Sequence, residues 1–116
     1  MEDASEIRTV LQQVVDALRR EYRPEKVVLF GSYASGVPHE DSDVDLLIIH
    51  KTDLPFFRRG AQVQRLIRHV RGSLPMDIIV LTPKELNTQL KRGNVFLEQV
   101  LREGEVLFEQ ARVKAS

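Results

Sequence analysis

The sequence predicts a small α/β or α+β domain, in which a mixed sheet of four or five strands carries helices mainly on one face. Two short apolar runs, 27–30 and 46–49, flank a polar loop and have the length and composition of strands. Segments with helical spacing of apolar residues precede and follow them, and a third apolar run comes later. The length, 116 residues, suits a single domain over 1–116 with a flexible tail from about residue 110.

The first half of the chain predicts a helix, two strands and the loop between them. Apolar residues recur three and four positions apart over 4–22, which indicates a helix with one buried face: Ile7, Val10, Leu11, Val14, Val15 and Leu18. Asp3 and Glu6 have the spacing of a helix-capping pair, and Pro24 ends the helix. A strand over 26–30, a short helical turn at 31–36, a polar loop at 37–42 and a strand over 43–50 follow.

The second half predicts three more helices and two more strands. A helix over 56–71 leads to a strand over 76–81. Thr82, Pro83 and Glu85 form a helix start with a capping box, and that helix runs to about residue 91. The last helix, 95–102, is expected to bury four apolar side chains before a short edge strand over 106–108: Phe96, Leu97, Val100 and Leu101.

The helix over 56–71 is strongly basic, since five arginines occur between Asp53 and Asp77 without an acid: Arg58, Arg59, Arg65, Arg68 and Arg71. Arg58, Arg65 and Arg68 share one helical stripe. The favoured interpretation is a solvated basic face. A docking surface for an acidic partner, or help with triphosphate charge, stays open.

Composition excludes several classes of protein. Lysine plus arginine and aspartate plus glutamate number 17 each, so general nucleic-acid binding is not expected. The absence of cysteine excludes a disulfide scaffold and a thiolate zinc site, and agrees with a reducing cytoplasm. We see neither a signal peptide nor a membrane-spanning run, so the expected location is cytoplasmic.

Two short motifs point to chemistry: Gly31-Ser32 after the first strand, and Asp43-Val44-Asp45 at the start of the second. Strand side chains alternate between faces, so Asp43 and Asp45 share a face about 7 Å apart at Cα, where Mg²⁺ or Mn²⁺ would relieve their repulsion. Gly31 allows close approach of backbone to a ligand and Ser32 adds a hydroxyl, which together suit a phosphate. Each motif alone could be an ordinary turn, but a carboxylate inside a Leu/Ile run is costly without a partner.

Gly31-Ser32, ten residues, then Asp43-x-Asp45 resembles the motif of the DNA polymerase β-like nucleotidyltransferase superfamily. In so short a chain it is similar to the minimal nucleotidyltransferases, the antitoxin partners of HEPN-domain toxins. The resemblance implies a nucleotidyltransferase fold, nucleotide binding by Gly31 and Ser32, and metal binding and catalysis by Asp43 and Asp45. It implies Asp77 as the third acid, which also accepts the proton of the attacking hydroxyl. One or two Mg²⁺ ions, or Mn²⁺, and ATP are the implied cofactor and nucleotide.

The function implied by the resemblance is an enzyme that moves AMP from ATP to a hydroxyl. The acceptor would be a tyrosine of a HEPN-domain toxin, with which the chain would form a hetero-oligomer as antitoxin. Two alternatives stay open. One is a catalytically weak binding module that neutralises its partner by occlusion, and the other is a transferase that acts on a small molecule or an RNA end. No residue visibly reads a base.

Overall fold

The computed structural model describes residues 4–36 and 43–111. The helices and strands in these ranges are α1 (Ala4–Glu21), β1 (Lys26–Phe30), α2 (Ser32–Ser35), β2 (Val44–Ile49), α3 (Phe56–Arg71), β3 (Met76–Leu81), α4 (Pro83–Lys91), α5 (Val95–Glu103) and β4 (Glu105–Glu109). Each agrees with its predicted segment within two residues at either end. The predicted cap residue Asp3, the predicted loop at 37–42, and residues 112–116 lie outside the described residues. Within the described ranges, none of the helices is both long and apolar enough to cross a membrane.

The four strands form one mixed sheet in the order β3-β2-β1-β4. β2 pairs with β3 in parallel, whereas β1 pairs with both β2 and β4 antiparallel. The parallel pair is connected through α3, since parallel strands need a crossover rather than a hairpin. The predicted fold class and the predicted edge position of the last strand are therefore confirmed.

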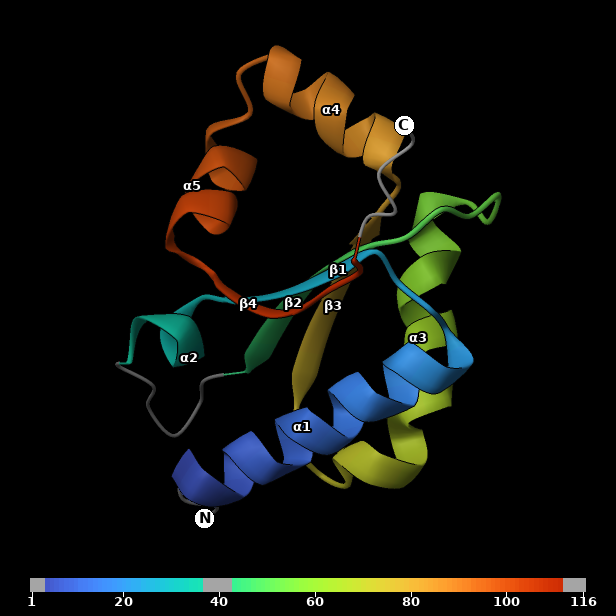
Figure 1. Cartoon of the computed structure of the whole chain (residues 1–116), viewed down its shortest axis with the longest axis vertical. Helices are drawn as coiled ribbons and strands as arrows, with labels where there is room; N and C mark the ends of the chain where they lie inside the picture. The colour runs from blue at the N-terminus through green and yellow to red at the C-terminus, as the bar shows by residue number, and fades with distance from the viewer. Residues whose placement is uncertain (1–3, 37–42, 112–116) are drawn as a thin grey trace.

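Helices cover both faces of this sheet (Figure 1). α1 and α3 pack on one face, against inward side chains that include Val27, Leu29, Leu46 and Ile48. α4 and α5 pack on the other face, against Val28, Leu47 and Ile49. The prediction of helices mainly on one face is wrong in this respect: the two long helices share one face, but α4 and α5 cover the opposite one. Adjacent residues of one strand serve the two layers because strand side chains alternate.

The prediction that Phe96 is buried is wrong. Its side chain is 48% exposed, whereas Leu97 and Val100 in the same helix are buried. The apolar residues of α5 span more of the helix surface than the sheet can cover, so part of Phe96 meets solvent. The rest of the side chain packs edge to face on Phe30, with ring centroids 5.6 Å apart at 82°.

The interpretation of the arginines in α3 as a solvated face is wrong for Arg59. Arg58, Arg65 and Arg68 are exposed, but Arg59 is 5% exposed. Its guanidinium donates to both carboxylate oxygens of Glu85, at 2.6 and 3.1 Å, and to the carbonyl oxygens of Leu54 and Val80. Glu85 also accepts from the Thr82 backbone N–H as part of the predicted capping box of α4. The pair thus links α3 to the start of α4, which a one-dimensional charge pattern does not reveal.

Candidate active site

One row of side chains crosses the end of the sheet from β1 to β3. Phe30 is the register partner of Asp45, and Asp45 is the register partner of Asp77. Partners in adjacent strands point to the same face, with backbones about 4.8 Å apart. The two predicted acids therefore lie side by side on the face that carries α4 and α5. The neighbouring row towards the middle of the sheet is apolar and lies under these helices: Val28, Leu47 and Ile79.

Asp43 joins this pair from the residue just before β2, where it is exposed. Asp45 is half-buried and Asp77 is exposed. Burial is the largest cause that raises the pKa of Asp45 above its usual range, and the charges of Asp77 and then Asp43 raise it further. Asp45 is therefore close enough to both of the other acids predicted from the sequence to be repelled by them.

Gly31 lies against the same carboxylate. Its backbone has φ 77° and ψ −154°, a conformation that residues other than glycine rarely adopt. A Cβ at this position would overlap Oδ2 of Asp45 and lie 3.3 Å from its Cγ. Ser32, half-buried, begins α2 directly afterwards. The glycine is needed because the backbone at the end of β1 and the acid of β2 share one small volume.

The donor set of this site is that of a hard cation, because three carboxylates supply oxygen ligands and Asp45 is repelled by the other two. Asp45 is the best placed of the three, since it is partly desolvated and also lies near the two other charges. In the part of the chain that the structure describes, no three His, Cys, Asp or Glu side chains are already arranged around one point as metal ligands. By the chemistry of their oxygen ligands, the three carboxylates fit a divalent cation.

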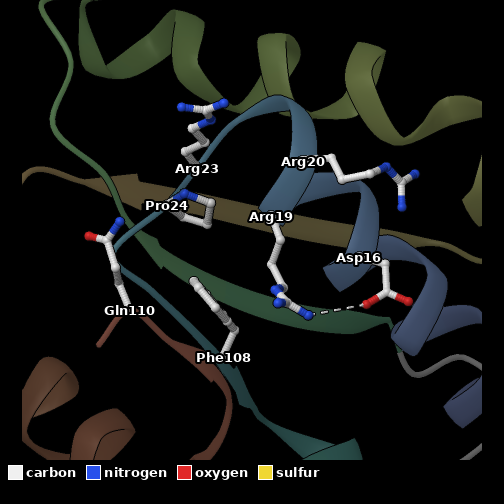
Figure 2. Close-up of a pocket in the computed structure, with 7 residues that line it drawn as sticks. All are labelled: Asp16, Arg19, Arg20, Arg23, Pro24, Phe108 and Gln110. Atoms are coloured by element: carbon white, nitrogen blue, oxygen red, sulfur yellow. Dashed lines mark ion pairs between the residues drawn. The ribbon is translucent and has the colours of Figure 1, made fainter. Parts of the chain in front are cut away.

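A separate pocket at the end of α1 carries no comparable chemistry. Its volume is about 430 Å³, and it is lined by Asp16, Arg19, Arg20, Arg23, Pro24, Phe108 and Gln110. Figure 2 shows that the arginine side chains point in different directions and that Arg19 pairs with Asp16, at 3.8 Å. The C-terminal end of a helix also disfavours an anion. The acidic end of the sheet is therefore the better candidate site.

Sequence reasoning missed that the surroundings of the acids are partly aromatic. Phe30 and Phe96 both looked like core residues because each stands in an apolar run. The structure places Phe30 in the same cross-strand row as Asp45 and brings Phe96 onto it from α5. No sequence signal links these two residues, since their contact depends on how α5 returns to the sheet.

Comparisons with known proteins identify the family of the chain. Residues 11–107 match the model of the family described as "Nucleotidyltransferase domain". "Putative protein adenylyltransferase MJ0604" of Methanocaldococcus jannaschii is 31% identical over 100 residues, which cover 84% of this chain and 94% of that protein.

Two solved structures have the same fold. One is described as a putative minimal nucleotidyltransferase and has a TM-score of 0.59 at 27% identity, covering 89% of this chain and 94% of that one. The other is a toxin–antitoxin structure with AMP-PNP, with a TM-score of 0.59 at 22% identity, covering 85% of this chain and 73% of that one. With the family match over most of its length, the mixed sheet and the acids at its end, the chain belongs to the nucleotidyltransferase domain family.

Proposed function

We propose that the chain is a metal-dependent protein adenylyltransferase that moves AMP from ATP to a hydroxyl group. The observation that carries the proposal is the meeting of Asp45 and Asp77 in one cross-strand row, with Gly31 against Asp45. Asp43, Asp45 and Asp77 would bind one or two Mg²⁺ ions. Gly31 and Ser32 would bind the β- and γ-phosphates. When bound, the cation supplies positive charge to the phosphate oxygens that gain negative charge in the reaction.

The chemistry is one displacement at the α-phosphorus. The acceptor hydroxyl oxygen forms a bond to the α-phosphorus. The bond between the α-phosphorus and the oxygen that bridges to the β-phosphate breaks, so that pyrophosphate leaves. The hydroxyl proton passes to the carboxylate of Asp77, which is exposed and can accept it from an incoming acceptor. Gly31 contributes by leaving room for Asp45 beside the phosphates.

We further propose a protein acceptor, namely a tyrosine of a HEPN-domain toxin, which AMP transfer would neutralise. Two likenesses support this choice. The relative from Methanocaldococcus jannaschii bears the name of a protein adenylyltransferase, and a structure of the same fold is a toxin–antitoxin with AMP-PNP.

The test is transfer of labelled AMP. The purified chain is incubated with host lysate, Mg²⁺ and ATP labelled at the α-phosphate, and intact masses of the proteins that bind it are measured. Wild type is compared with Asp43→Asn and with Asp53→Asn, a matched change at an exposed aspartate beyond the opposite end of β2.

The proposal expects a partner that gains one AMP with wild type and Asp53→Asn, but not with Asp43→Asn. A partner that binds all three proteins equally and gains no mass would contradict the transfer reaction and support a binding module that neutralises its partner by occlusion. If small molecules or RNA become labelled and no protein does, the acceptor is a small molecule or an RNA and not a protein.

A further inference from the structure

A cavity of about 600 Å³ opens beside Gly31, and Asp45 is not among the described residues that line it. Phe30, Gly31 and α2 form one wall, and α5 forms the other with Phe96, Gln99 and Glu103. Phe30 belongs to the row that contains Asp45 and Asp77, so the cavity lies on the same face of the sheet as the candidate active site. Its volume is within the range of small-molecule sites, about 300–1,000 Å³.

We propose that this cavity binds the nucleobase of the nucleoside triphosphate. The inference rests on the proposed function, because it assigns a subsite to the nucleotide of that same reaction. It supplies what the sequence could not show, namely the residues that contact the base: Phe96 and Phe30 on its ring faces or edges, and Gln99 and Glu103 on its polar rim.

The chemistry of the lining favours a base over a phosphate. Among the described residues that line the cavity there is no lysine or arginine, and the carboxylate of Glu103 would repel an anion. Phe96 is 48% exposed and contributes an aromatic ring to the lining of the cavity. An aromatic ring of this kind stacks with any base, because every base has a π face. The amide of Gln99 can donate and accept, and Glu103 can accept, so both suit the polar edge of a base.

The position of the cavity favours the nucleotide over the acceptor. In an in-line displacement, the attacking hydroxyl approaches the α-phosphorus from the side opposite the leaving pyrophosphate. If the pyrophosphate lies at Gly31 and Ser32, the acceptor approaches from the side away from Gly31. A cavity that borders Gly31 is therefore on the wrong side for the acceptor, but within reach of the nucleoside of a folded triphosphate.

The cavity is preformed, which favours binding over a chance gap. A Cβ at Gly104 would lie 2.6 Å from Cγ1 of Val28 and 3.0 Å from the carbonyl oxygen of Leu29, so α5 ends directly on β1. At the other end of the wall, Phe96 rests edge to face on Phe30. These two contacts hold α5 at a set distance from α2, and a ligand would not need to separate them.

The experiment compares the affinity for Mg²⁺·ATP with that for Mg²⁺·tripolyphosphate, which lacks the nucleoside, by titration calorimetry. Phe96→Ala should bind ATP roughly tenfold more weakly than wild type, which corresponds to the loss of one base–aromatic stack. Its affinity for tripolyphosphate should be unchanged. Phe57→Ala is the matched control, since Phe57 is 79% exposed at the start of α3 and does not line the cavity. Gln99→Ala is a second variant at an exposed position, in case the loss of Phe96 affects folding.

The outcomes separate this inference from the proposed function. Equal ATP affinity for wild type, Phe96→Ala and Gln99→Ala would overturn the base site and leave the transfer reaction intact. Wild type that binds ATP no more tightly than tripolyphosphate would do the same. Wild type that binds neither would overturn both. If ATP binding depends on Phe96 but no AMP is transferred in the labelling test, the base site is supported and the proposed transfer activity is refuted.

Discussion

Replacement of Gly31 by alanine tests whether its closeness to Asp45 matters for function. The new Cβ would overlap Oδ2 of Asp45 and lie 3.3 Å from its Cγ. The carboxylate would have to move by about 1 Å to reach an ordinary contact, and a displacement of that size in an active site can lower a rate about 100-fold. The expected result is a roughly 100-fold loss of AMP transfer by a protein that still folds.

The conformational strain of this change needs its own control, because Gly31 has positive φ. Gly72 is well matched: its backbone has φ 58° and ψ −130°, close to the 77° and −154° of Gly31, but a Cβ there would meet nothing within 4 Å. Alanine at either position should cost about 1–3 kcal/mol of folding free energy from strain.

Transfer of AMP from labelled ATP is measured for both variants, together with thermal unfolding. Similar losses of stability, with loss of transfer confined to Gly31→Ala, would support the assignment of Gly31 and Asp45 to one site. Transfer by Gly31→Ala within about twofold of Gly72→Ala would refute the reasoning, since a misplacement should cost far more.

Three further predictions concern charge. Asp45→Asn should abolish transfer yet raise the melting temperature in metal-free buffer by about 3 °C, because it removes a half-buried charge that Asp77 and Asp43 repel; a lower melting temperature would contradict this. Mg²⁺ at 100 times its dissociation constant should stabilise wild type by about 2.7 kcal/mol but not Asp45→Asn, and equal stabilisation of both would place the metal elsewhere. Arg59→Met should lower the free energy of unfolding by about 2 kcal/mol, which is less than the loss of a fully buried ion pair because Glu85 is 40% exposed. The hydrogen bond from Arg59 holds the pKa of Glu85 below its ordinary value of 4.5. The loss of unfolding free energy in Arg59→Met, measured by chemical unfolding, should therefore be fully present above pH 4.5 and shrink as the pH falls through the lowered pKa. A loss that does not depend on pH would argue against the pair.

The elements of the fold could be predicted from the sequence because their signals are local. Apolar spacing in α1 and α3, the Thr82–Glu85 capping box and the three apolar runs each act over a few neighbouring residues. The Asp43-x-Asp45 motif is of the same kind, since two residues apart along a strand always share a face. Asp77 was predicted through the resemblance to a family, because no spacing along the chain relates it to Asp45.

What the tertiary structure decided are the contacts between distant segments. The parallel register of β2 and β3 sets Asp77 beside Asp45, and the turn after β1 sets Gly31 against the same carboxylate. The burial of Arg59 and the exposure of Phe96, both contrary to the sequence prediction, depend on which side of each helix meets the rest of the molecule. Sequence periodicity shows that a helix has an apolar side, but packing determines how much of that side the sheet can cover.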